Sequence, residues 1–213
     1  MSNKISNRMV IYWLWVPATA IAWFAGIFDL TNASARSYSE IARLLPVYLL
    51  DGLLIGSVAG MGQAWILRGF MPQVSRWFWA TALGYTLAFP VSLILTILIP
   101  AIAFPIHGEK FLPIYGPSTM TIYLADSLFW GAFIIGIAQW QVLKQIVQQP
   151  DVKKAMLWTL STWLGCGLGI FVQGWLLNVH LAALDRAAIG LVLGMVTGLA
   201  LLILLPLEVQ TDR

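Results

Sequence analysis

Two aspartates and two glutamines stand inside apolar stretches of this chain, where ionisable and amide side chains are rare. Asp51 and Asp126 each lie near the start of such a stretch, and Gln63 and Gln139 follow near its other end. An ionised carboxylate in lipid costs about 2.5 kcal/mol or more, so an acid there is a candidate proton, cation or substrate site. Glutamine amides in the same setting form hydrogen bonds between helices or line a polar permeation path.

The two acids also fit a structural role as helix N-caps. A carboxylate at a helix start accepts hydrogen bonds from the first free amides and is favoured by the helix dipole. From Asp51 to Arg68, and from Asp126 to Lys144, the chain runs for roughly 18 residues, enough for a helix to cross a bilayer. Both roles, cap and functional site, are compatible with the sequence.

Other chemistry-bearing residues are sparse. His107 and His180 are isolated, whereas a haem or metal site needs ligands that converge. Cys166 lies in an apolar run, as small packing residues do. Motifs of zinc proteases, serine hydrolases and phosphate-binding loops do not occur. We predict no catalytic residue, no metal site and no cofactor, and the sequence leaves pigment, haem or quinone binding open.

The composition indicates an integral membrane protein. Of the 213 residues, 60% are hydrophobic and 10% are charged, and the mean hydropathy is +0.83. Soluble domains average about 25% charged residues, so this chain lacks the charge to cover a water-facing surface. The net charge of +3 does not indicate nucleic-acid binding, because the basic residues are scattered rather than gathered on one face. We expect a single transmembrane domain over residues 1–213.

Six apolar runs separated by short charged connections predict an all-α bundle of six transmembrane helices. The runs cover residues 9–28, 45–67, 78–104, 120–143, 156–177 and 187–205. Each is close to the ~20 residues that a spanning helix needs, and none has the alternation of a barrel strand. Before the fifth run, Pro150 and Asp151 predict a helix stop followed by an N-cap.

The basic residues predict the orientation of these spans. Eight of them fall on the side of the termini: Lys4, Arg8, Arg68, Arg76, Lys144, Lys153, Lys154 and Arg213. The other four, Arg36, Arg43, Lys110 and Arg186, fall on the opposite side. Short connections rich in Lys and Arg stay in the cytoplasm, so both termini are predicted to be cytoplasmic.

A polar motif occurs twice at the end of an apolar run. Gly60-x-x-Gln63-x-x-x-Leu67-Arg68 recurs as Gly136-x-x-Gln139-x-x-x-Leu143-Lys144, an offset of 76 residues (60 to 136, 63 to 139). The next run opens with Trp-x6-Gly in both cases, at Trp77 and at Trp158. A weaker third copy is Asp185-x4-Gly190-x3-Gly194, with Thr197 in the place of Gln63. We therefore expect three parallel hairpins around a pseudo-threefold axis: 51–104, 126–177, and 185–205 paired in space with 9–28.

Glycines, most of them spaced four residues apart, mark faces for helix packing. They are Gly56, Gly60, Gly136, Gly165, Gly169, Gly190, Gly194 and Gly198. Lipid provides no hydrophobic drive for helix association, so close backbone approach and dispersion must hold the helices together. The alternative is a smooth face that admits a flat pigment or quinone ring.

The repeat resembles one found in a group of uncharacterised polytopic membrane proteins common in cyanobacteria. Their spans end in Gly-x-x-Gln-Trp-x-x-Leu-Arg, which the second copy matches with Trp140 directly after Gln139. The first copy departs from it, because Trp65 lies one place further from Gln63. The resemblance covers about residues 51–200 and implies a bacterial plasma or thylakoid membrane, but it brings no established activity.

Eleven tryptophans are many for a chain of this length. Those near the ends of predicted spans indicate an aromatic belt at the membrane interface or packing between helices: Trp13, Trp15, Trp77, Trp79, Trp140 and Trp158. Trp23, Trp130 and Trp163 lie deeper, where they would pack or line a pocket.

These features favour a non-enzymatic accessory, assembly or scaffolding component that packs in the bilayer against other membrane proteins or against itself. The alternative is a small transporter or channel that uses Asp51, Asp126, Gln63 and Gln139. A third interpretation is binding of a pigment, haem or quinone.

Overall fold

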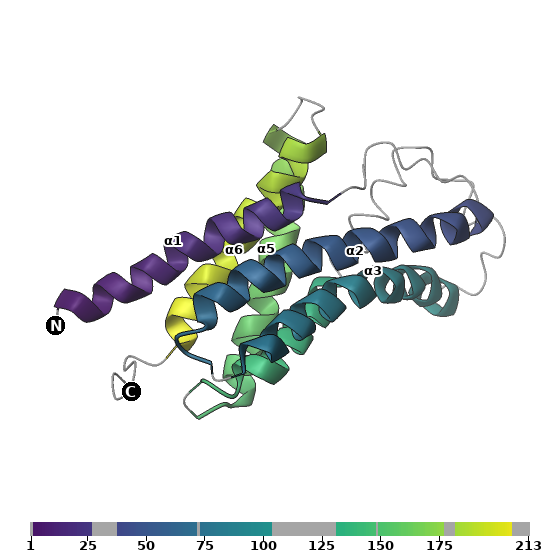
Figure 1. The fold of residues 1–213 in the computed structure, drawn as a ribbon. Helices are drawn as coiled ribbons and strands as arrows, with labels where there is room; N and C mark the ends of the chain where they lie inside the picture. Colours follow the sequence, from purple (N-terminus) through teal and green to yellow (C-terminus); the bar gives the residue numbers. More distant parts are fainter. Residues whose placement is uncertain are drawn as a thin grey trace.

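The computed structural model describes residues 2–26, 38–71, 73–103, 131–147, 149–176 and 182–205. These residues form six helices, and no strand occurs among them (Figure 1). The helices are α1 (Ser2–Phe24), α2 (Tyr38–Leu67), α3 (Val74–Ala103), a helix over Gly131–Leu143, α5 (Val152–Leu176) and α6 (Ala182–Leu204). The expected all-helical fold is confirmed.

Each predicted apolar run overlaps a helix of the described residues, although the bounds differ. α2 begins at Tyr38, before the expected start at residue 45, and ends as expected at Leu67. Among the described residues, three helical segments are long and apolar enough to cross a membrane: Leu45–Leu67, Val152–Val172 and Arg186–Leu204. Met9–Phe24 and Gly131–Leu143 are apolar but shorter.

Local hydrogen bonds explain where helices end at the two short turns. The carbonyl of Leu67 accepts hydrogen bonds from the amides of Phe70 and Met71 at 2.9 and 3.0 Å, which closes α2. Before α5, the Asp151 carboxylate accepts a hydrogen bond from the Lys154 amide at 2.7 Å. This bond is the N-cap that the sequence predicts, because it satisfies a first-turn amide that has no partner within the helix.

The helices form a closed ring. α1 packs against α2, α2 against α3, and α5 against α6, while α6 closes the ring on α1 (Figure 1). The Gly131–Leu143 helix stands between α3 and α5. A Cβ added at Gly84 of α3 would meet Ala138 at 3.4 Å, and one added at Gly136 would meet Thr159 of α5 at 3.0 Å.

Glycine brings backbones into contact at three corresponding places in the ring. The pairs are Gly60 with Phe78, Gly136 with Thr159, and Gly194 with Val16. A Cβ added at any of these glycines would lie 3.0 Å from a backbone atom of the facing helix. Each facing residue directly follows a tryptophan in the sequence. Within each of the three pairs, the two helices therefore pack against each other in the same way.

The other predicted packing glycines also face helices of this chain. Gly56 faces Ala82 and Tyr85, Gly165 faces Leu193, Gly169 faces Ile189, Gly190 faces Thr19 and Trp23, and Gly198 faces Tyr12. At Gly56, Gly169 and Gly190 an added Cβ would lie less than 3.0 Å from a backbone atom of the facing helix, whereas at Gly198 it would meet the ring of Tyr12. The glycine faces are therefore occupied inside the ring.

We expect Gly190→Ala to destabilise the protein by about 1–3 kcal/mol, the usual effect of overpacking a tight contact. The added methyl would lie 2.7 Å from Trp23 Cβ and 2.8 Å from the Thr19 carbonyl oxygen. Gly69→Ala is the matched control, since no atom lies within 4 Å of a Cβ there. Thermal unfolding of the purified variants measures both effects, and equal losses would contradict the packing argument.

Candidate functional site

Three tryptophans meet at the centre of the ring. Trp15 of α1, Trp77 of α3 and Trp158 of α5 are each 0% exposed. Their ring centroids lie 5.8, 6.0 and 6.2 Å apart in edge-to-face geometry, an arrangement that aromatic pairs favour. Trp77 belongs to the first turn of α3, and Trp158 belongs to the second turn of α5. This tryptophan cluster therefore fills the axis near the end where the α2–α3 turn and the turn before α5 lie.

An aromatic belt is the wrong interpretation for these residues. A belt side chain faces the membrane interface, whereas the tryptophan cluster is enclosed by protein and Trp140 is also buried. Trp13 and Trp79 behave differently, because they are 64% and 56% exposed on the outside of the ring.

The sequence contains a signal for the cluster that hydropathy alone does not reveal. Each of its tryptophans is followed four residues later by a threonine: Thr19, Thr81 and Thr162. All three threonines are buried. Residues four apart share one face of a helix, so the Trp-x3-Thr pattern marks the face of α1, α3 and α5 that points to the axis.

The two repeat glutamines lie beside this cluster in a buried polar layer. Gln139 Nε2 donates hydrogen bonds to Thr81 Oγ1 at 3.2 Å and to Gln63 Oε1 at 3.5 Å. Gln63 Nε2 donates to Thr19 Oγ1 at 3.2 Å, and Gln63 Oε1 also accepts from Trp77 Nε1 at 3.3 Å. Both glutamines are buried. Buried polar groups require hydrogen-bond partners, and these amides find theirs on neighbouring helices, which they thereby join.

Thr197 takes the place of the glutamine in the third helix pair. Trp15 Nε1 donates to Thr197 Oγ1 at 3.0 Å, which corresponds to the bond from Trp77 to Gln63. Thr197 Oγ1 donates in turn to the Leu193 carbonyl at 2.7 Å. The polar layer thus connects α6, α1, α2, α3 and the Gly131–Leu143 helix through side-chain hydrogen bonds.

Trp158 departs from this pattern. Its Nε1 is buried and has no hydrogen-bond partner within the described part of the chain. Gln139 occupies the position that corresponds to Gln63, but its amide nitrogen is directed to Thr81 and Gln63. A buried donor without a hydrogen bond costs about 1–3 kcal/mol. The pair formed by the Gly131–Leu143 helix and α5 is therefore the least stabilised of the three pairs by side-chain hydrogen bonds.

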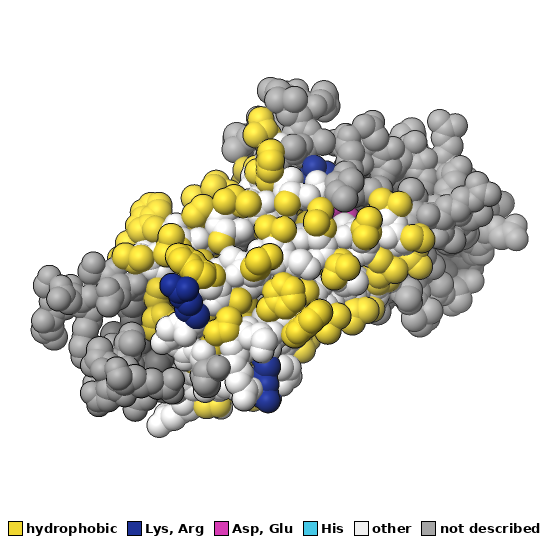
Figure 2. All heavy atoms as spheres, viewed as in Figure 1, with side chains coloured by type: hydrophobic (Ala, Val, Ile, Leu, Met, Phe, Trp, Pro, Cys, Tyr) yellow, Lys and Arg dark blue, Asp and Glu magenta, His cyan; other side chains and the backbone are white. Residues whose placement is uncertain are grey.

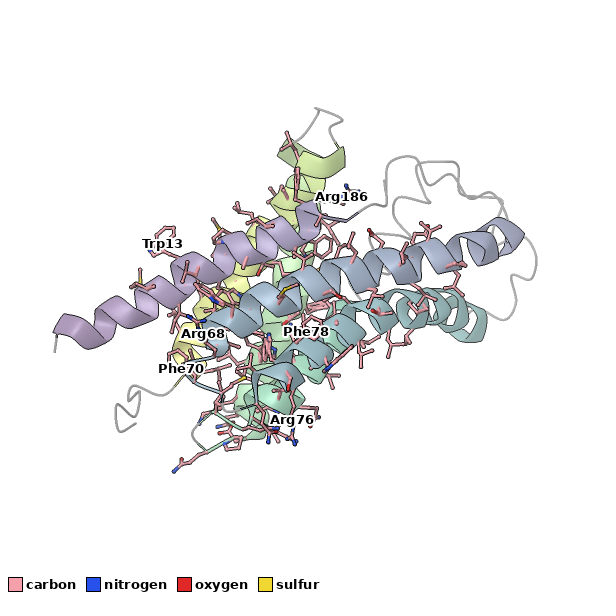
Figure 3. All side chains as sticks on the ribbon, in the orientation of Figure 1. Trp13, Arg68, Phe70, Arg76, Phe78 and Arg186 are labelled. Carbon is pink, nitrogen blue, oxygen red and sulfur yellow. The ribbon has the colours of Figure 1, made fainter. Side chains whose placement is uncertain are left out.

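Asp51 lies inside α2 and not at its start. Because α2 begins at Tyr38, the N-cap interpretation of Asp51 is wrong. A Cβ added at Gly26 would lie 3.1 Å from Asp51 Oδ1, so the carboxylate lies against the end of α1. Arg186 of α6 is buried one turn before Gly190 and lies toward the same end of the ring (Figure 3). Opposite charges therefore stand at the end remote from the tryptophan cluster.

Several predicted residues lie outside the described residues. They are Asp126, His107, His180, Trp130, Arg36, Lys110 and Arg213. Within the described ranges, no group of three or more His, Cys, Asp or Glu side chains is placed to hold a metal ion. The sequence predicts Arg186 in an outer connection, whereas in the structure it lies within α6 and its side chain is buried.

Comparisons of the chain with protein-family models, curated proteins and solved structures gave no match. Its function has to follow from its own geometry. The relevant features are the buried polar layer, the tryptophan cluster that fills the axis, and the charged residues at the two ends of the ring.

Replacement of the cluster tryptophans by phenylalanine separates packing from hydrogen bonding. We expect Trp15→Phe to destabilise the protein by at least about 1 kcal/mol more than Trp158→Phe, because Trp15 loses a hydrogen bond whereas Trp158 loses a buried donor that has no partner. Both changes remove the same volume from the same cluster. Denaturant unfolding of the two variants gives the difference. Equal losses would mean that the indole hydrogen bond contributes nothing.

Proposed function

We propose that this chain is a non-enzymatic, multi-pass membrane protein of six spans that serves as an accessory, assembly or scaffolding component. It packs through its outer face against other membrane proteins or against copies of itself. The observation that carries this proposal is the distribution of polarity in the ring. Amides and hydroxyls lie inside, and aliphatic and aromatic side chains lie outside.

Large apolar side chains are exposed on every helix of the ring. Examples are Trp13, Ile21, Leu50, Met61, Leu83, Leu87, Ile137, Leu164, Phe171, Leu191 and Ile203. Figure 2 shows apolar atoms spread over the visible face of the described residues. A water-soluble protein places its charged residues there, whereas lipid requires an apolar exterior and internally satisfied polar groups.

The helix contacts support three parallel hairpins within the six spans. The pairs are α2 with α3, Gly131–Leu143 with α5, and α6 with α1. Five cations with described side chains lie at the α2–α3 turn and at the turn before α5, on the side predicted for the termini: Arg68, Arg76, Lys144, Lys153 and Lys154. Under the positive-inside rule they support cytoplasmic termini. A bacterial plasma or thylakoid membrane is the proposed location.

Partner binding through glycine grooves, as the sequence suggested, does not fit this geometry. Gly60 and Gly136 are in contact with backbone atoms of neighbouring helices of the same chain. A partner would instead meet aliphatic and aromatic side chains such as Met61 and Leu83, which are 62% and 50% exposed. Substitution of the glycines would therefore disturb the fold before it disturbed an association.

Site-specific photo-crosslinking tests the proposed role. A photoreactive residue is introduced at one exposed position per helix, at Ile21, Met61, Leu83, Ile137, Leu164 and Ile203. We expect stoichiometric protein cross-links from one or two neighbouring helices, because a docked partner covers only part of the ring. The cross-linked bands are identified by mass spectrometry after extraction in mild detergent.

The buried Ile189 provides the control position, since its side chain is 0% exposed and should give only cross-links within the chain. Cross-links to lipid alone from all six exposed positions would contradict the proposed role as an accessory or scaffolding component.

A transporter or channel is the second candidate, and the buried polar layer favours it. Gln63 and Gln139 place amides at the axis, and Asp51 lies further along α2 toward the other end. The tryptophan cluster argues against this candidate, because it fills the axis between the amides and the end that carries the α2–α3 turn.

The transporter candidate predicts that Asp51→Asn abolishes a proton or monovalent-cation flux into liposomes. The substitution keeps the side-chain shape and removes its charge, and thermal unfolding of the variant, measured beside the flux, shows whether it is folded. Asp151→Asn is the control, since Asp151 is an exposed cap. A flux that Asp51→Asn leaves unchanged would remove this candidate.

A further inference from the structure

Five of the six cations whose side chains are described gather at one end of the ring, and the sixth, Arg186, lies toward the other end. Arg68 and Arg76 flank the α2–α3 turn, and Lys144, Lys153 and Lys154 flank the turn before α5. We refer to these five residues as the basic end. Asp151 is the only acid whose side chain is described there, and it caps α5 through the Lys154 amide. The basic end therefore carries an excess of positive charge.

Exposed tryptophans stand at the same end of the bundle. Trp65 is 55% exposed in the last turn of α2, and the Arg68 guanidinium lies over its ring, 4.9 Å from the centroid. Trp79 is exposed near the start of α3, and Trp13 projects outward from α1 (Figure 3). Exposed tryptophan beside exposed Arg and Lys is the side-chain pattern of a membrane–water interface.

We propose that the basic end binds the phosphate of anionic phospholipid headgroups, such as phosphatidylglycerol, with Arg68 and Arg76 as the principal contacts. This inference rests on the proposed membrane insertion. Tryptophans at the headgroup level set the depth of the α2–α3 turn in the bilayer. A guanidinium presents a planar fork of donors that matches two phosphate oxygens.

Charge decides which lipid is favoured. A phosphatidylcholine headgroup carries a cationic choline beside its phosphate, which the basic end repels. Phosphatidylglycerol has the same phosphate without that cation, so it gains the full attraction of Arg68 and Arg76. In Figure 2 the visible Arg and Lys side chains of this end border the apolar face, where a phosphate would lie directly above acyl chains.

Native mass spectrometry of the purified full-length protein, titrated with phosphatidylglycerol or phosphatidylcholine, measures this preference. We expect wild type to bind phosphatidylglycerol more tightly. The variant Arg68→Gln/Arg76→Gln should lose about fivefold in phosphatidylglycerol affinity for each cation removed, with phosphatidylcholine binding unchanged. Arg68→Lys/Arg76→Lys should bind phosphatidylglycerol with an affinity between those of wild type and the glutamine variant, because the charge is kept and the planar fork is lost.

Gln73→Ala/Gln145→Ala is the matched control, because both glutamines are exposed at the same end and uncharged. It should bind both lipids as wild type does. The inference is overturned if wild type shows no preference, if the glutamine variant keeps it, or if the neutral control loses it.

Reconstitution separates this inference from the proposed function. Wild-type protein is inserted into vesicles of phosphatidylcholine alone and extracted with alkaline carbonate. Protein that stays in the vesicles but shows no headgroup preference would refute the lipid site only. Protein that carbonate removes would refute membrane insertion, and with it the proposed function.

Discussion

Backbone contact at glycine is the constraint on which the ring of helices depends. At Gly60, Gly136 and Gly194 a single added carbon would lie 3.0 Å from the backbone of the facing helix. Helices that approach this closely gain dispersion energy along their length, which is the main attraction available where the solvent is lipid. The contacts also fix the rotation of each helix, and so they decide which side chains reach the axis.

The same rotation brings the repeat glutamines and the cluster tryptophans together. The Gln63 side chain forms hydrogen bonds with Thr19, Trp77 and Gln139, so this one amide joins four helices. In the described part of the chain most interior polar side chains form hydrogen bonds with one another, and the tryptophan cluster fills the axis. The proposed activity lies at the remaining surfaces, which are the apolar outer face and the charged ends.

The three helix pairs are related without being identical. Thr197 replaces a glutamine in one pair, and Trp158 lacks the indole hydrogen bond that Trp15 and Trp77 form. A shorter side chain or an unmade bond lowers the stability of one part of the layer without removing the common packing. The glycine contacts, which recur in all three pairs, are therefore more fundamental to the fold than the hydrogen bonds.

The sequence by itself determined the helices, the Asp151 cap and the spacing that relates Gln63 to Gln139, because hydrophobic run length and local hydrogen bonding depend on neighbouring residues only. The tertiary structure alone decided that Trp15, Trp77 and Trp158 face the axis while Trp13 and Trp79 face outward. It also decided that α2 extends past Asp51 to Tyr38 and that Arg186 is buried. The physical reason is that an apolar side chain suits both lipid and a helix interface, so composition does not distinguish the two faces. The two faces are distinguished only by which of them packs, at a glycine contact, against a neighbouring helix.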